Sequence, residues 1–400
     1  MSSKTADVVI VGGGITGLSI ALHLKSLGVP RVIVLERHHV GAGQSGRAAG
    51  IVRALVNHSG VASMLLDSLR FLNHFNESYG ESIAVNQAGY LLIQHAAQSE
   101  VLNEVIRNAA AAGCEARQIR VEEARELQPG LNAQSDAVCA FEPGAVHVDP
   151  MVVTQALARV AARMGVEIEP GCEVDSVVID KQQVRGVATQ SGLRQAGKVV
   201  IATAIWGKSQ LEKAGVVVPV YPHRVEMAFF SVFPKSPDRL LRILSDARTL
   251  LYLRPEGRDQ MFAGWREGDR IASPKDFAVV DPDHYRQTSH YASLADMQRR
   301  LATTLPFMND GFVHRTYACV YDYTPDGMPI LDAAERVQGL YFALGYSGGG
   351  FSLAPWVGSA MARFITAGVK SPEMQLLRLK RFEEGQLLSW SNAEKETGHA

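Results

Sequence analysis

The sequence of 400 residues has little cysteine, no excess of either charge and no long apolar run. Its four cysteines, Cys114, Cys139, Cys172 and Cys319, form no C-x-x-C pair and show no metal-site spacing, so neither a disulfide framework nor a bound metal is expected. Lys and Arg number 40 against 41 Asp and Glu, which argues against nucleic acid or an anionic membrane as a partner. No stretch is apolar for long enough to span a bilayer, and the N-terminus lacks the features of a signal peptide. These absences favour a cytoplasmic globular protein without a transmembrane segment.

The first forty residues carry a pattern typical of a dinucleotide-binding βαβ unit. A β-branched apolar run precedes the motif G-G-G-I-T-G, and a helical pattern follows it. Within the motif, Gly12 permits a tight turn, Gly14 lets a pyrophosphate approach the backbone, and Gly17 lets the helix pack close to the strand. A second apolar run ends in Glu36, at the spacing where a carboxylate usually binds a ribose hydroxyl. An ordinary glycine-rich turn is the alternative, but the complete context favours a nucleotide site.

A second glycine cluster lies near the other end of the chain. Residues 345–355 read G-Y-S-G-G-G-F-S-L-A-P and open a helix that is expected to continue to residue 365. Glycines before a helix present bare N–H donors and the positive end of the helix dipole. Because the first motif already supplies a pyrophosphate site, this cluster suits another anionic part of the same cofactor, such as the pyrimidine end of a reduced flavin. The alternative is a plain turn between strand and helix.

The loop after Glu36 is rich in small residues and can run beside a flat ligand. It covers residues 37–50, with Ser45 and Arg47 as polar contacts, and a flexible surface loop is the alternative. Arg53 follows the apolar pair Ile51 and Val52, directly after this loop. A guanidinium there could bind a substrate carboxylate through two parallel hydrogen bonds, although spacing alone favours a surface salt bridge.

The motifs in this order resemble those of the D-amino-acid oxidase-like FAD flavoproteins, most closely the sarcosine oxidase and glycine oxidase branch. The resemblance covers about the whole chain and includes the first glycine motif with Glu36, G-A-G-Q-S-G-R-A-A-G, T-P-D-G-M-P-I and G-Y-S-G-G-G-F. It implies FAD, two-electron oxidation of a C–N bond by hydride transfer to flavin N5, and an imine that water hydrolyses. The motifs specify the superfamily and leave the substrate open.

Individual positions carry family roles by resemblance. Arg53 in I-V-R matches the arginine that binds the substrate carboxylate in monomeric sarcosine oxidase. Cys319 in C-V-Y-D-Y-T-P-D matches the cysteine that forms a thioether to the flavin in covalent members, and a small buried hydrophobe is the alternative. Two lysines of those relatives are replaced, by Ser352 after the last glycine cluster and by Arg266 at the flavin face. Both changes leave the substrate, and oxygen as the electron acceptor, open.

The predicted catalytic residues are Arg53, Arg266, Tyr252 and Tyr346, with Tyr317 and Trp265 as further candidate walls of an aromatic pocket. The predicted cofactor contacts are Gly12, Gly14, Ile15, Thr16, Gly17, Glu36, Arg37, Gln44, Ser45, Arg47, Ala48, Ala49, Gly50, Val174, Ala202, Trp206, Cys319, Asp326, Gly345, Tyr346, Ser347, Gly348, Gly349, Gly350, Phe351 and Ser352.

The expected fold is α/β, or α+β overall: a Rossmann-like FAD-binding domain with an inserted, mostly antiparallel β substrate domain. The FAD-binding domain is assigned to residues 1–85, 145–215 and 320–390, and the substrate domain to residues 86–144 and 216–319.

Three functions stay open at this point. The first is an oxidase of an amino acid or secondary amine such as sarcosine or proline, using O2. The second is a dehydrogenase that passes electrons to a quinone or a partner subunit, and the third is a non-catalytic FAD-holding subunit of a larger complex. The sequence leaves homo-oligomer and hetero-complex equally open.

Overall fold

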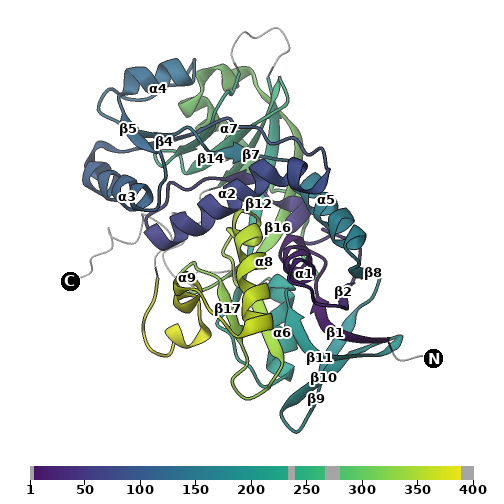
Figure 1. The fold of residues 1–400 in the computed structure, drawn as a ribbon. Coiled ribbons are helices and arrows are strands. Elements are labelled where there is room, and N and C mark those ends of the chain that lie inside the picture. The colour runs from purple at the N-terminus through teal and green to yellow at the C-terminus, as the bar shows by residue number, and fades with distance from the viewer. Residues whose placement is uncertain (1–3, 233–238, 266–279, 389–400) are drawn as a thin grey trace.

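Two large sheets organise the computed structural model, which describes residues 4–232, 239–265 and 280–388. Figure 1 shows the first sheet at the end of the molecule that holds both β1 and β9, and the second at the end that holds α4 and β5. Long helices lie between them (Figure 1). The mixed α/β fold with a Rossmann-like unit is therefore confirmed.

The first sheet is the nucleotide-binding sheet and is mostly parallel. Its order is β17-β18-β11-β1-β2-β8, with parallel pairing from β18 to β8 and an antiparallel β17 at the edge. An antiparallel hairpin of β9 and β10 joins the first part of β11. The strands are β1 (Lys4–Val11), β2 (Val32–Glu36), β8 (Glu167–Pro170), β9 (Val174–Asp180), β10 (Gln183–Thr189), β11 (Gly192–Ile201), β17 (Ile330–Ala333) and β18 (Leu340–Leu344).

Successive side chains of a strand point to opposite sides, so each strand of this sheet contributes to two cores, and long helices cover one of them. Val8 and Ile10 of β1 pack into the core that includes the helices, whereas Val9 and Val11 pack on the β9–β10 hairpin side. Helices α1 and α8 lie side by side in Figure 1, and a Cβ on Gly358 would come within 2.1 Å of Ser19 Oγ. The helices of this side are α1 (Ile15–Ser26), α2 (Ser59–Tyr79), α5 (Pro150–Arg163) and α8 (Gly350–Ala367), and α6 (Gly207–Lys213) lies on the other side.

The second sheet is antiparallel except for one pair. Its order is β16-β12-β15-β14-β13-β4-β6-β5, and only β13 and β4 run parallel among its described strands. Helix α7 (Tyr291–Thr304) covers its outer face. The strands are β4 (Tyr90–Gln94), β5 (Arg117–Ile119), β6 (Val138–Glu142), β12 (Tyr221–Ser231), β13 (Ile243–Asp246), β14 (Leu251–Glu256), β15 (Gln260–Trp265) and β16 (Phe312–Tyr323).

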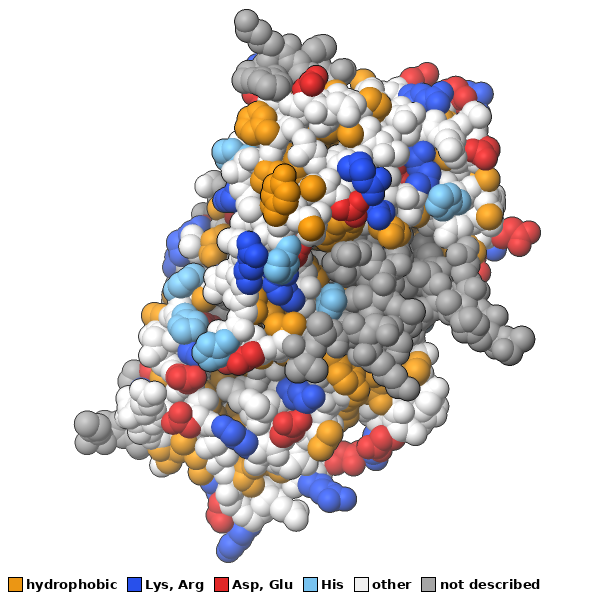
Figure 2. All heavy atoms as spheres, turned by 180° about the vertical axis from the view of Figure 1, so that it is seen from behind, with side chains coloured by type: hydrophobic (Ala, Val, Ile, Leu, Met, Phe, Trp, Pro, Cys, Tyr) orange, Lys and Arg blue, Asp and Glu red, His pale blue; other side chains and the backbone are white. Residues whose placement is uncertain are grey.

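Smaller elements complete the described chain. Strands β3 (Ile51–Val52) and β7 (Val146–His147) pair with each other, and the remaining helices are α3 (Ser99–Ala111), α4 (Val121–Leu127) and α9 (Pro372–Leu376). None of the helices in the described ranges combines the length and apolarity that crossing a membrane requires. On the face shown in Figure 2, acidic and basic side chains are interspersed.

Candidate cofactor site

The first glycine motif forms a turn that only glycine can make. Gly12 has φ +112°, and a Cβ there would lie 2.5 Å from Ala202 O, directly after β11. A Cβ on Gly17 would lie 2.0 Å from Gly12 O, so the helix could not pack against the turn. The backbone reasons given above for these two glycines are therefore confirmed.

Polar groups gather where β2 and α1 meet this turn. The Ile15 N–H at the start of α1 donates to Ser45 Oγ at 2.9 Å, and Gly14 provides no side-chain cap. Glu36 accepts from Gly13 N at 2.8 Å and from His38 N at 2.8 Å. Two N–H groups of this turn are thus bonded to side chains of the loop and of β2, and the carboxylate is held in place at the end of β2.

A second helix begins at the same cavity. Gly349 is the N-cap of α8, with no side-chain cap and no acidic residue in the first turn. The preceding loop is held by Asp322, whose Oδ2 accepts from Gly345 N at 2.7 Å. Burial raises the pKa of Asp322 to about 6. The cavity therefore lies between the positive ends of two helix dipoles.

The cavity brings together residues from all parts of the sequence. Those of the predicted cofactor contacts that line it are Gly12, Gly14, Ile15, Thr16, Glu36, Arg37, Gln44, Ser45, Arg47, Ala48, Val174, Ala202, Trp206, Cys319, Tyr346, Gly348, Gly350 and Phe351. Gln44 donates from Nε2 to Val320 O, which ties the small-residue loop to β16.

The sequence model of the FAD dependent oxidoreductase family matches residues 7–364. The chain belongs to this family of FAD-dependent oxidoreductases. It is 27% identical over 396 residues to sarcosine oxidase subunit beta of Arthrobacter sp, an alignment covering 96% of this chain and 93% of that protein. It is 23% identical to the 4-methylaminobutanoate oxidase (formaldehyde-forming) of Paenarthrobacter nicotinovorans, covering 98% of this chain but only 49% of that longer protein. Its fold is similar to L-proline dehydrogenase from P. horikoshii, with a TM-score of 0.87 at 25% identity over 96% of this chain and 100% of that chain.

The residues of this oxidoreductase fit FAD, the cofactor of its family. A nucleotide with a pyrophosphate needs close backbone approach and N–H donors, and Gly14 and Thr16 at the start of α1 line the cavity. Glu36 at the end of β2 suits a ribose. The N–H groups at Gly350 and Phe351 suit a second anionic part. We propose that these groups bind FAD.

Some predicted contacts do not line the cavity. They are Gly17, Ala49, Gly50, Asp326, Gly345, Ser347, Gly349 and Ser352. Several support it from behind: a Cβ on Gly50 would lie 2.1 Å from Val148 O, and Ser347 Oγ accepts from Thr324 N at 3.1 Å. Among the catalytic predictions, Tyr346 lines the cavity, Arg53 and Tyr252 do not, and Arg266 lies outside the described residues.

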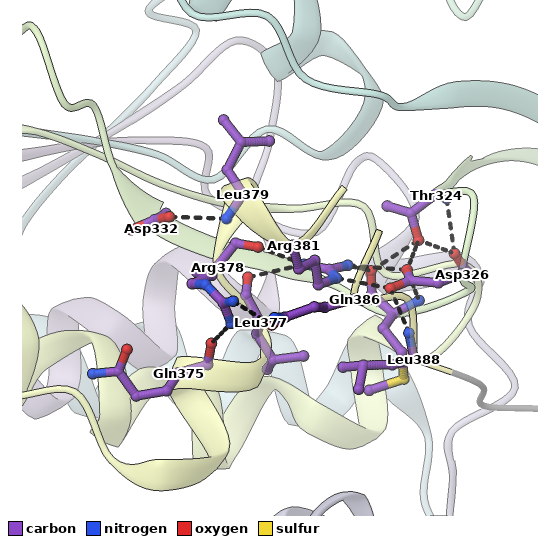
Figure 3. Close-up of polar contacts among 12 residues, drawn as sticks. Thr324, Asp326, Asp332, Gln375, Leu377, Arg378, Leu379, Arg381, Gln386 and Leu388 are labelled. Carbon is purple, nitrogen blue, oxygen red and sulfur yellow. Dashed lines mark hydrogen bonds and ion pairs between the residues drawn. The ribbon is translucent and has the colours of Figure 1, made fainter. Parts of the chain in front are cut away.

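Asp326 is the clearest correction to the predicted contacts. Its carboxylate is fully buried and forms a two-bond ion pair with Arg381, from Nε to Oδ2 at 2.7 Å and from Nη2 to Oδ1 at 3.0 Å. It also accepts from Met328 N and Leu388 N, at 3.1 and 3.2 Å (Figure 3). With its oxygens engaged inside the protein, Asp326 has no access to a cofactor. It fastens residues 381–388, the C-terminal segment, to the T-P-D-G loop.

The inner face of the second sheet is aromatic and reaches the cavity at Cys319. Met227, Phe229, Phe262 and Cys319 form one buried cluster, with Ala49, Tyr252, Tyr317 and Tyr321 packed against it. Register explains the grouping, because Tyr252 pairs with Gly264, and Met227 pairs with both Gly264 and Tyr317. Trp265, adjacent to Gly264, therefore points to the outer face, where it donates to Ser293 Oγ at 3.2 Å. The expectation that Trp265 forms a pocket wall was wrong.

Cys319 is buried on this inner face and lines the cavity. Burial raises the pKa of its thiol to about 12, so the neutral thiol predominates at physiological pH in the described structure. The nearby Arg47 guanidinium acts in the opposite direction on this pKa. The location is compatible with a link to the cofactor, and the thioether stays a proposal.

Arg53 lies away from the cavity lining. It donates from Nη1 to Leu55 O, and its guanidinium lies 4.6 Å from the centre of the Tyr90 ring. The buried Glu142 nearby accepts from Ala54 N at 2.7 Å and from Leu55 N at 2.9 Å. Burial raises the pKa of Glu142, and the two backbone hydrogen bonds and the charge of Arg53 act on this pKa in the opposite direction. Arg53 therefore lies beside Tyr90 and Glu142, outside the lining of the cofactor cavity.

Sequence reasoning missed part of the cavity wall. The residues are Val11, Leu35, His38, Ala42, Gly43, Cys172, Glu173, Thr203, Ala204, Gln210, Pro282, Asp283, Tyr285, Gln287, Val320, Tyr321 and Asp322. Asp322 and Tyr321 stand in the C-V-Y-D-Y-T-P-D motif, where alternation along a strand could have indicated Tyr321. Nothing in the sequence around Asp283 indicates a site.

Proposed function

We propose that this oxidoreductase oxidises the C–N bond of a small amino acid or secondary amine that carries a carboxylate, of the sarcosine or proline type. The observation that carries the proposal is the aromatic inner face of the second sheet, which meets the cofactor cavity at Cys319. Sarcosine oxidase subunit beta and L-proline dehydrogenase, whose names describe such substrates, support the choice of class.

FAD bound in the cavity would supply the two-electron acceptor for a hydride from the substrate CH–NH unit, and water would hydrolyse the resulting imine. The chain's own residues prepare the substrate. Tyr252 and Tyr317, packed against the fully buried Phe262, would give the amine surroundings of low polarity, with ring centres 5.8 Å apart for Tyr252 and Phe262 and 6.5 Å for Phe262 and Tyr317. Such surroundings disfavour a charged ammonium and so favour the neutral amine, the form that can lose a hydride.

Two arginines compete as the carboxylate-binding group. We assign this role to Arg53, because Nη1 is its only described donor with a partner, at Leu55 O, and its remaining N–H groups are available for a fork-shaped pair. Arg315 is the rival. It pairs in register with Phe229 on the inner face, lies 4.1 Å from that ring centre, and forms no ion pair within the described residues.

The test compares Arg53→Ala with Arg315→Ala as its matched variant. We expect Arg53→Ala to raise KM for a carboxylated amine by roughly 30-fold or more, the equivalent of about 2–4 kcal/mol for a charge-assisted pair. KM for an analogue without the carboxylate should change little. A large rise in KM with Arg315→Ala, and not with Arg53→Ala, would transfer the role to Arg315.

The electron acceptor is the remaining choice. An anaerobic screen of N-methyl, cyclic and D-amino acids, watching loss of flavin colour, identifies the substrate. Oxygen consumption with peroxide release then indicates an oxidase, whereas turnover with a dye alone indicates a dehydrogenase that uses a quinone or partner subunit. A chain that holds FAD and is reduced by no amine would contradict the proposal and favour an FAD-holding subunit.

A further inference from the structure

Residues 281–290 connect the second sheet with the nucleotide-binding sheet. We call this segment the strap. At its sheet end it is held by backbone and hydroxyl groups. Gln287 O accepts from Ala318 N at 2.8 Å, and Ser289 N donates to Thr316 Oγ1 at 3.0 Å. Ser289 Oγ also donates to the carbonyls of Met227 and Tyr317, at 3.1 and 3.2 Å. This end is therefore anchored to both β12 and β16.

A single arginine strengthens the same anchor. Arg224 of β12 donates from Nε to Arg286 O at 2.9 Å and from Nη2 to Thr288 O at 2.7 Å. Ala318, which bonds to the strap, precedes Cys319, so the anchor lies beside the part of β16 that lines the cavity.

At the opposite end Tyr285 packs against the core of the nucleotide-binding sheet, and the polar contacts converge on one side chain. Asp283 Oδ1 accepts from Arg37 Nη2 at 2.8 Å and from Trp206 Nε1 at 2.8 Å. Arg37 follows the last residue of β2, and its guanidinium lies 5.2 Å from the Trp206 ring centre. Between the two ends, Pro282, Asp283, Tyr285 and Gln287 form one wall of the cavity. The strap thus crosses the cavity on the side of Glu36, where the nucleotide part of FAD belongs.

The two ends differ in strength. The side chains of Arg37 and Asp283 are 30% and 43% exposed, so water and salt compete with their ion pair. The sheet end is held by more bonds, to backbone groups of β12 and β16, to Thr316 Oγ1 and to the Arg224 guanidinium, and Ser289 is buried. An opening motion would break the Asp283 contacts first and pivot about residues 286–290.

We infer that the strap retains FAD and that Asp283 is its releasable end, so that the contacts of Arg37 and Trp206 with Asp283 set how fast the cofactor leaves and enters. The inference concerns the cofactor alone and does not depend on which amine is oxidised.

The experiment measures FAD release in a Cys319→Ala background, so that a covalent link cannot hide it. Release is followed by the rise in FAD fluorescence after dilution. We expect Asp283→Asn to speed release roughly five- to tenfold at low salt, as for loss of one charge-assisted pair. The parent should release FAD faster as salt rises, and the variant should be much less sensitive to salt. Asp180→Asn, which removes an exposed ion pair with Arg185, is the matched control and should behave as the parent.

A second measurement keeps the test independent of release. Hydrogen exchange of the FAD-loaded chain should quicken in Asp283→Asn at residues 281–285 and stay unchanged at Gln287 and Ser289. Trp206→Phe, which keeps the ring and loses the N–H donor, should show a smaller effect in the same direction. Release rates and exchange that match the parent in both variants, or an equal effect of Asp180→Asn, would overturn the inference.

Discussion

The ion pair of Asp326 and Arg381 allows a sharp prediction because both side chains are 0% exposed. Arg381→Met keeps most of the side-chain length and removes the guanidinium. Asp326 then loses two hydrogen bonds, at 2.7 and 3.0 Å, and stays buried as an uncompensated carboxylate. The carbonyls of Met328 and Leu377, which Arg381 also satisfies at 2.8 and 3.0 Å, lose a donor as well.

The expected cost is about 3–5 kcal/mol of unfolding free energy, the usual penalty for removing one partner of a buried pair. The double variant Asp326→Asn with Arg381→Met should be more stable than Arg381→Met alone, because no buried charge is left unpaired. Urea unfolding followed by tryptophan fluorescence, with refolding to establish reversibility, measures both values. Asp180→Asn at an exposed pair should cost less than about 0.5 kcal/mol.

Two results would refute this reasoning. A cost below about 1 kcal/mol for Arg381→Met would mean that water or another cation reaches Asp326. A double variant as unstable as the sum of its single variants would mean that the two residues act independently, and the pair would not be the feature that holds the C-terminal segment (Figure 3).

Three further predictions rest on single residues. Gly17→Ala should abolish FAD binding, measured by flavin absorbance after purification, since its Cβ would lie 2.0 Å from Gly12 O; Gly197→Ala, with no atom within 4 Å of its Cβ, should retain FAD. Burial, aided by a nearby arginine, lowers the pKa of His23 from 6.5 to about 4, so its contribution to stability is complete above pH 6.5 and is lost as pH falls towards 4. Between pH 7.5 and pH 5, the unfolding free energy of His23→Gln should therefore fall by about 2 kcal/mol less than that of the unsubstituted protein, measured by urea titration. An equal fall in both proteins would contradict this. After acid precipitation of Cys319→Ser, all flavin should be found in the supernatant, whereas the pellet of the unsubstituted protein should stay yellow if the thioether forms. A colourless pellet of the unsubstituted protein would exclude the thioether.

Local signals predicted several elements well because their causes are local. Leu65, Leu69 and Leu72 recur at helical spacing through α2. Asp149, directly before Pro150, caps α5 by accepting from Val152 N at 2.9 Å. In the first glycine motif, the close approach of Gly17 to Gly12 O also lies within a few residues. Periodicity, capping and turn chemistry need no knowledge of tertiary contacts.

Pairing between distant strands could not be predicted in this way. β13 has only four residues, and it joins β4 in parallel from about 150 positions later in the chain. Alternating side chains in β14 and β15 are typical of strands, but alternation alone leaves open which side faces the cavity. That choice is made by register, since Tyr252 opposes Gly264, and a shift of one residue would have placed Trp265 on the inner face.

The T-P-D-G segment shows how a sequence motif can belong to a site without touching it. Thr324 Oγ1 donates to Met328 O at 2.8 Å and lies 3.2 Å from Asp326 Oδ1, while Thr324 N donates to Ser347 Oγ. Ser347 N in turn donates to Asp322 O at 3.1 Å. The buried pair with Arg381 is thereby connected, through one loop, to the backbone that delivers the first turn of α8 to the cavity. A motif predicted to bind the cofactor directly instead holds in place the loop that precedes α8, because a helix N-terminus can stabilise an anion only if the loop before it is rigid.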